Sequence, residues 1–265
     1  MKRVMLTVAY DGTDYCGWQV QPNGVTIEQR LNEALSRLLG EDIHVSGASR
    51  TDSGVHAMCN LAVFDTENPM DPGRISFAVN TYLPPDIKVR RSMEVPADFH
   101  PRFAQTEKTY EYRILNSSFP VPVRSRYTHF CYYKLDTEKM DRAAKYLVGE
   151  HDFASFCSVH AQVSDTVREV TGAEVFSEEH EGAFSEPWRE IVIRVSGKGF
   201  LYNMVRIIAG TLIEVGRGAL EPECVPEILE GRDRSLAGPT APATGLCLTD
   251  YRILWIEFEY YNPVD

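Results

Sequence analysis

The sequence has 265 residues, 43% of them hydrophobic and 25% charged, which is enough to fill the core of one large or two small globular domains. No window approaches the roughly 20 uninterrupted apolar residues of a membrane-spanning helix, so we expect no membrane association. The six cysteines show neither a Cys-x-x-Cys spacing nor a cluster with histidine, which predicts reduced thiols in a cytoplasmic protein without structural zinc.

The net charge of −11 excludes a surface that is basic overall, but two stretches are locally basic. Residues 86–126 carry eight basic and five acidic side chains, and residues 189–217 carry five and two. Because nucleic-acid binding depends on where cations gather, these stretches permit such a partner. A plain scatter of basic residues is the alternative.

The first hundred residues predict the element order β-α-β-β-α-β. Apolar residues alternate over 4–10 as in a strand, which also distinguishes this segment from a signal peptide. A helix begins at Thr26, which forms a capping box with the glutamine three residues later, and ends at Gly40. A second helix begins with Asp71 as its N-cap and Pro72 as its first residue. The other expected strands are 43–45, 57–64 and 87–91.

The rest of the chain predicts a similar order of elements. A helix begins at Asp136 and ends before Gly149, and another covers 204–215. This repeat favours an α+β fold with two ferredoxin-like βαββαβ halves, 1–104 and 105–265, whose antiparallel sheets flank a central active-site cleft. The expected strands are 110–114, 128–133, 172–176, 190–195 and 253–260, and the expected exposed loops are 177–187 and 236–244.

The most informative stretch is 47–57, Gly-Ala-Ser-Arg-Thr-Asp-Ser-Gly-Val-His-Ala. Its carboxylate, Asp52, lies in a polar turn between two apolar runs, two residues after Arg50. By spacing alone, an Asx-turn that caps backbone N–H groups is a common explanation for such an aspartate. The run from Asp52 to Gly54 also matches the Asp-(Thr/Ser)-Gly of aspartic proteases. That reaction needs two aspartates sharing a proton, so this single motif would require a symmetric dimer, and Arg50 would oppose the sharing.

Motifs along nearly the whole chain resemble those of the tRNA pseudouridine synthase A family. Residues 50–56, Arg-Thr-Asp-Ser-Gly-Val-His, match its active-site motif, with Ser53 in place of the commoner alanine. Ile27 and Glu28 stand where valine and glutamine are usual. The other matching segments, in the family's order, are 10–13, 17–21, 83–87, 99–103, 108–112, 151–156, 200–206 and 241–246.

This resemblance implies an RNA isomerase that converts uridine to pseudouridine at positions 38–40 of the anticodon stem-loop of tRNA. It implies a homodimer that uses neither a cofactor nor a metal ion. Asp52 is the implied nucleophile. Arg50 either pairs with Asp52 and keeps it ionised, or fills the gap left by a flipped base. Tyr110 is the implied active-site tyrosine, which stacks on the uracil and whose hydroxyl can help to remove the C5 proton.

Four further residues are candidates for substrate binding. Arg206 lies in a largely apolar helix, where an unpaired charge is costly, so we expect it to face a partner such as Asp52. His56, Arg102 and Lys108 are expected to contact RNA. The spacing of Asp52 and His56 is too weak a signal to predict a metal site.

A non-catalytic RNA-binding module is the second alternative, because ferredoxin-like sheets often bind RNA through exposed aromatic residues. The sequence contains no such strand motif, and a binding module has no need of Asp52.

Overall fold

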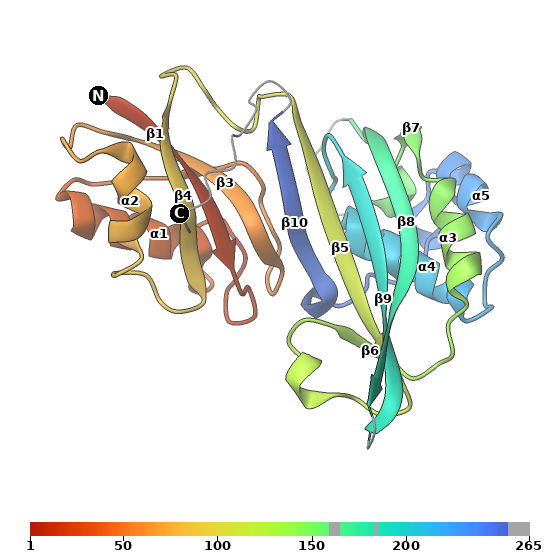
Figure 1. Ribbon diagram of the computed structural model, residues 1–265. Coiled ribbons are helices and arrows are strands. Elements are labelled where there is room, and N and C mark those ends of the chain that lie inside the picture. Colours follow the sequence, from red (N-terminus) through yellow and green to blue (C-terminus); the bar gives the residue numbers. More distant parts are fainter. Residues whose placement is uncertain (159–164, 183–184, 254–265) are drawn as a thin grey trace.

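The computed structural model describes residues 1–158, 165–182 and 185–253 (Figure 1). Within these residues, ten strands form one sheet in the order β4-β1-β3-β10-β5-β9-β8-β7, with β2 paired to β3 and β6 paired to β5. The strands are β1 (Lys2–Tyr10), β2 (Ser46–Gly47), β3 (His56–Thr66), β4 (Ile87–Val95), β5 (Thr106–Asn116), β6 (His129–Cys131), β7 (Gly149–Asp152), β8 (Val167–Gly182), β9 (Ser185–Gly197) and β10 (Leu246–Ile253). The α-helices are α1 (Ile27–Leu39), α2 (Pro72–Val79), α3 (Thr137–Lys145), α4 (Met204–Gly216) and α5 (Cys224–Gly231). Short 3₁₀ turns cover Pro122–Arg124, Ala154–Phe156, Arg234–Leu236 and Ala243–Gly245.

The first half follows the predicted element order, β1-α1-β2-β3-α2-β4, with antiparallel neighbours in the order β4-β1-β3-β2. Only β2 is displaced from its predicted place at 43–45. The backbone N–H groups of Ile43 and Val45 donate to side chains of α1, at 2.9 Å to Ser36 and 2.8 Å to Asn32. These groups are therefore not available to a strand ladder, and pairing begins at Ser46.

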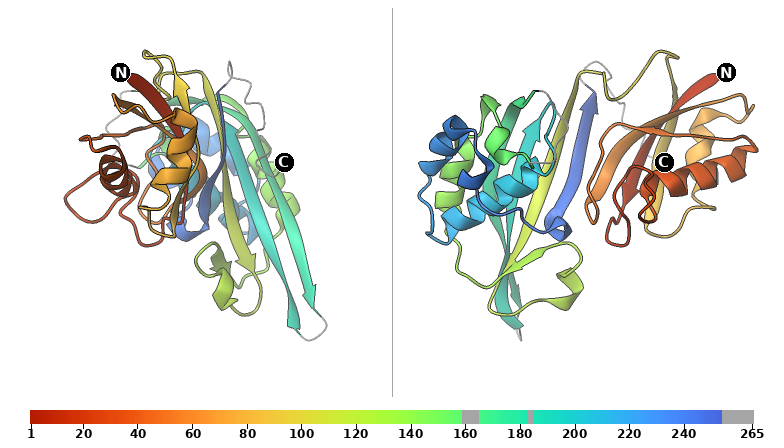
Figure 2. Two further views of the ribbon diagram at one scale, coloured as in Figure 1. Left: turned by 60° about the vertical axis from the view of Figure 1, so that its left-hand side comes forward. Right: turned by 180° about the vertical axis from the view of Figure 1, so that it is seen from behind.

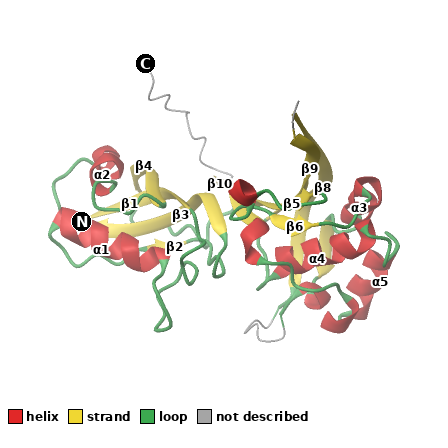
Figure 3. Cartoon of the chain, turned by 90° about the horizontal axis from the view of Figure 1, so that it is seen from below, coloured by secondary structure: helices red, strands yellow, loops and turns green. Residues whose placement is uncertain are grey.

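The mixed α+β class is confirmed, but the two expected sheets are one. Strand β10 pairs in parallel with β3 through Cys247–His56 and Leu248–Ala57, and antiparallel with β5 on its other side. It therefore joins the two halves of the sheet (Figure 1). Helices α3, α4 and α5 lie together on one side of β5, β9 and β8 (Figures 2 and 3). None of the described helices has the length and apolarity to cross a membrane.

Within the tract 177–187, predicted as an exposed loop, residues 177–182 and 185–187 instead continue the sheet. Strands β8 and β9 extend as a two-stranded ribbon beyond their neighbours (Figure 2). The rings of His180 and Trp188 stack across the ribbon with centroids 3.9 Å apart. Arg113 on β5 binds Glu178 and Glu190, at 2.9 and 3.0 Å. These cross-strand contacts stabilise extended structure in an acidic segment that has low intrinsic strand propensity.

The tract 236–244 is irregular as predicted, but part of it is buried. The Gly238 N–H donates to Thr211 Oγ1 at 2.9 Å, and the Ala241 N–H donates to the Arg206 carbonyl at 3.1 Å. This tract therefore packs along α4. Helix α5 was not predicted, because acidic residues interrupt its short buried face of Val225, Ile228 and Leu229. Of the predicted strand 253–260, Ile253 ends β10 and the rest lies outside the described residues.

Candidate active site

Asp52 lies in the loop between β2 and β3, and buried polar contacts fix this loop. The hydroxyls of Tyr10 and Thr51 lie 2.7 Å apart. The fully buried Asn60 donates from Nδ2 to the Ser49 carbonyl at 2.9 Å and accepts from the Ser49 N–H at 3.3 Å. Because both peptide groups of Ser49 are bonded to one side chain, the backbone three residues before Asp52 is held in place.

The first motif of the chain packs against the outside of this loop. A Cβ atom at Gly12 would lie 2.0 Å from the Val55 carbonyl oxygen. One at Gly17, where φ is +81°, would lie 2.6 Å from the Thr51 carbonyl oxygen. These close approaches require glycine. Trp18 donates its backbone N–H to the Thr51 carbonyl at 3.0 Å, and its side chain belongs to the core.

Arg206, the third residue of α4, reaches Asp52 from the other half of the chain. Its Nη1 lies 3.5 Å from Asp52 Oδ2, which confirms the expected pairing. Two further contacts orient the guanidinium: Nε donates to the Ala241 carbonyl and Nη1 to Asn203 Oδ1, each at 2.8 Å. The Asp52 and Arg206 side chains keep exposures of 22% and 19%, so a substrate can reach both.

The electrostatics at Asp52 are those of a half-desolvated ion pair. Burial raises the pKa of Asp52 above its ordinary value, and the Arg206 guanidinium opposes that rise. Arg50 is not the ion-pair partner of Asp52. Its side chain is exposed, and within the described part of the chain it forms no ion pair with a carboxylate. The alternative in which Arg50 pairs with Asp52 is therefore wrong, because Asp52 faces α4.

Tyr110 is the second residue brought to this junction. It lies on β5 between Leu248 of β10 and Val195 of β9, with 8% of its surface exposed. Its ring meets that of Phe200 edge to face, at a centroid distance of 5.2 Å. Burial raises the pKa of the Tyr110 hydroxyl above its ordinary range, and the nearby Tyr10 and Asp52 act in the same direction.

The other predicted binding residues lie in different environments. His56 is only 5% exposed, and its Nδ1 lies 3.1 Å from both Asp11 Oδ1 and the Gly12 nitrogen. His56 therefore helps to hold the Asp52 loop in place and has little exposed surface that RNA could contact. Arg102 is exposed and donates to the Gly47 carbonyl, where β2 leads into the Asp52 loop. Lys108 is half-buried.

Two residues of the site, Asn60 and Asn203, were not predicted from the sequence. Asn60 lies in an apolar strand and Asn203 immediately precedes an apolar helix, so a polar amide in an otherwise apolar run was the available signal. Asn203 also adopts a left-handed backbone, with φ +60°, and its Nδ2 donates to Ser158 Oγ at 2.8 Å. The sequence does not show which groups either amide contacts.

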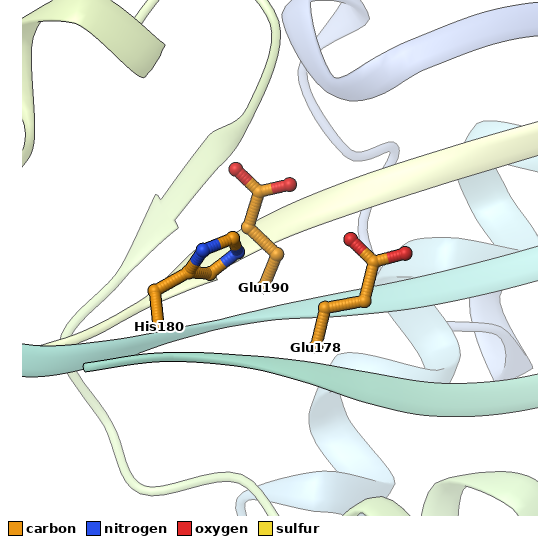
Figure 4. Close-up of side chains that lie close together, drawn as sticks. All are labelled: Glu178, His180 and Glu190. Carbon is orange, nitrogen blue, oxygen red and sulfur yellow. The ribbon is translucent and has the colours of Figure 1, made fainter.

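One group of possible metal ligands occurs among the described residues, far from Asp52 in the fold. Glu178, His180 and Glu190 project from β8 and β9 with ligand atoms within 4.8 Å of one another (Figure 4). Both carboxylates already bind Arg113, and Glu190 also binds Arg124 at 2.6 Å. These guanidiniums neutralise the carboxylates and would repel a cation, so the group belongs to an ion-pair network.

The chain is similar to known proteins along nearly its whole length. The family model described as tRNA pseudouridine synthase matches residues 6–104 and 143–252. A tRNA pseudouridine synthase A of Brevibacillus brevis is 48% identical over 250 residues, covering 94% of this chain and 98% of that one. Namesakes from Ruminiclostridium cellulolyticum and Caldicellulosiruptor bescii are 46% and 41% identical, each over 94% of this chain and over 98% and 99% of their own. The chain therefore belongs to the tRNA pseudouridine synthase family, a family of isomerases.

Proposed function

We propose that this protein converts uridine to pseudouridine at positions 38–40 of the anticodon stem-loop of tRNA, with Asp52 as the nucleophile. The observation that carries the proposal is the meeting of Asp52, Arg206 and Tyr110, which come from distant segments of a chain that belongs to this family. Each residue lies where its chemistry serves the isomerisation.

Asp52 supplies a carboxylate that can bond covalently to the nucleoside and leave again. In the reaction, the bond between uracil N1 and ribose C1′ breaks and the base rotates. A bond from C5 to C1′ then forms, C5 loses its proton, and N1 gains one. Attack by Asp52 at C1′ or at base C6 is compatible with this balance. Arg206 favours the ionised, nucleophilic form of Asp52, because it opposes the effect of burial on the pKa of that carboxyl.

In this proposal, the part of Tyr110 that acts on the uracil is mainly its aromatic ring. Because burial raises its pKa, the hydroxyl stays protonated near neutral pH and cannot act as a base in the resting enzyme. The ring, held edge-on by Phe200, can stack on the extruded uracil. Removal of the C5 proton by the hydroxyl would require the hydroxyl to give its own proton to N1 as it accepts the C5 proton, after the base has rotated.

Arg50 is proposed to enter the gap that the flipped base leaves in the RNA stack. Its exposed guanidinium is planar and can meet a phosphate at the same time. Arg102 and Lys108 are proposed to contact RNA phosphates. His56 acts through the loop that it supports, and direct contact with RNA is not favoured by its burial.

The family resemblance also supports three wider proposals. Residues 1–104 and 105–265 form two ferredoxin-like halves, the protein acts as a homodimer, and it acts in the cytoplasm. A dimer would let one tRNA contact basic residues of two acidic chains. Sedimentation equilibrium, with and without tRNA, measures the stoichiometry.

The test of the function is release of tritium from tRNA whose uridines are tritiated at C5. The purified protein is compared with Asp52→Asn, which is nearly isosteric and tests the charge alone. Release by the wild type and none by the folded variant supports both the reaction and the nucleophile. Release by both would remove Asp52 from its role. Binding of tRNA without release by either protein would favour a non-catalytic RNA-binding module.

A further inference from the structure

The segment that links β4 to β5 lies against the entrance of the Asp52 loop. His100 Nε2 lies 3.2 Å from Ser46 Oγ, and Arg102 Nη2 donates to the Gly47 carbonyl at 3.4 Å. The Tyr251 hydroxyl of β10 donates to the Pro101 carbonyl at 3.3 Å. Since Gly47 ends β2 and the chain then runs directly into the Asp52 loop, this segment is fixed beside the active site.

Two cations, Arg102 and Lys108, lie at this place. Within residues 1–158, 165–182 and 185–253, neither Arg102 nor Lys108 forms an ion pair with a carboxylate. The Lys108 ammonium instead lies over the Tyr251 ring, 5.4 Å from its centroid. Burial and the charge of Arg102 lower the pKa of Lys108 to about 8. Two neighbouring cations, of which Lys108 is partly desolvated, repel each other unless an anion lies between them.

Lys108 also faces the reacting centre. It precedes Tyr110 by two residues on β5, so their side chains project from the same face of the strand. An anion bound at Lys108 therefore lies next to the ring that we propose to stack on the uracil. A phosphate in this position would belong to a nucleotide close to the target.

Phe103, the residue after Arg102, adds an exposed flat apolar surface to the same turn. Its side chain is 81% exposed, and its ring lies 4.8 Å from that of His100. The turn beneath it is ordered: the Phe103 N–H donates to the His100 carbonyl at 3.0 Å and the Arg102 N–H to His100 Nδ1 at 3.2 Å. An exposed aromatic ring on a fixed turn beside unpaired cations has the composition of a single-strand nucleotide site.

We propose that Arg102, Phe103 and Lys108, here called the linker corner, bind one nucleotide next to the target uridine. Its base stacks on Phe103, and its phosphate lies between Arg102 and Lys108. This inference rests on the proposed function, because it takes RNA as the ligand. The corner would hold the strand that leads into the site after the target base has left the stack.

The test compares Phe103→Ala, Phe103→Tyr and Phe77→Ala, with unmodified tRNA as the probe. Phe77 is a matched control, since it is 71% exposed and lies on α2, which packs on β4, and β1 separates β4 from the strand β3 that follows the Asp52 loop. Phe103→Ala should raise the Kd for tRNA and the KM about tenfold, with a smaller change in kcat, since one base–aromatic stack is lost. Phe103→Tyr should restore binding, and Phe77→Ala should bind tRNA as the wild type does.

The charges of the corner are tested by the salt dependence of binding. Arg102→Gln and Lys108→Gln should each reduce the slope of log Kd against log salt by about 0.7 to 0.9, the value for one phosphate contact. Wild-type affinity and slope in the Phe103 and Lys108 variants would overturn the corner and leave the proposed function standing. Equal weakening by Phe103→Ala and Phe77→Ala would also overturn it. Failure of the wild type to release tritium would overturn the proposed function, while the binding comparison still decides the corner.

Discussion

Replacing Arg206 with glutamine should move the acid limb of the pH–rate profile to higher pH. Arg206 Nη1 lies 3.5 Å from Asp52 Oδ2, in a pair whose side chains are 19% and 22% exposed. At that separation the attraction is about 5 kcal/mol for an effective dielectric constant of about 20, and about 1 kcal/mol in bulk water. Since the pair is neither buried nor fully solvated, we expect Arg206 to stabilise the Asp52 carboxylate by about 2 kcal/mol.

The sign follows from which form Arg206 favours. Its charge stabilises the carboxylate, so its loss raises the pKa of Asp52 further in the direction in which burial already shifts it. Below the raised pKa, more of Asp52 is protonated and, in the proposed mechanism, unable to attack. Well above the raised pKa, Asp52 is ionised in the variant as well, so the loss of rate that comes from its protonation disappears. Any loss of rate that remains then comes from lost contacts between Arg206 and RNA.

The assay is tritium release under kcat/KM conditions, measured between about pH 5 and 8, where a raised carboxyl pKa becomes visible. Arg206→Lys is the matched control, because it keeps the charge and loses the planar fork. Its acid limb should lie close to that of the wild type. An acid limb that stays in place in Arg206→Gln, while the variant folds and binds tRNA, would refute the electrostatic reasoning.

Three further predictions use other contacts of the structure. Tyr110→Phe should keep tRNA affinity and Tyr110→Leu should lose it by about tenfold in a filter-binding assay, because the proposed contact with the uracil is made by the ring and not by the hydroxyl; equal affinities would contradict the stacking role. Asn203→Gly keeps the left-handed backbone but removes one of the two anchors of Arg206, so its acid limb should shift in the same direction as that of Arg206→Gln, by less; a profile identical to the wild type would show that Ala241 alone suffices. Glu190→Ala leaves Arg113 and Arg124 without their buried partner and should lower the free energy of unfolding by about 3 kcal/mol in urea titration; a loss below about 1 kcal/mol would show that Glu178 and Glu111, which also pair with Arg113, replace it.

Local patterns predicted most of the regular elements correctly. Helix α1 begins after Thr26, whose side chain accepts from the Gln29 N–H, and ends before Gly40 with φ +72°. Helix α2 follows the Asp71 cap with Pro72 at its first turn. Such signals are local because caps and amphipathic faces are set within a few residues. Where a distant side chain competes for the backbone, as Asn32 does at Val45, the pattern misplaces the strand.

The sequence by itself determined the family, the candidate nucleophile and the pairing partner expected for Arg206. Motif residues are identified by type and order, and an arginine in an apolar helix requires an anion wherever the chain provides one. Only the tertiary structure decided that Arg206, rather than the adjacent Arg50, neutralises Asp52. It also decided that β10 joins both halves into one sheet. Such pairings depend on which faces meet across more than a hundred residues, and short-range periodicity carries no information about that.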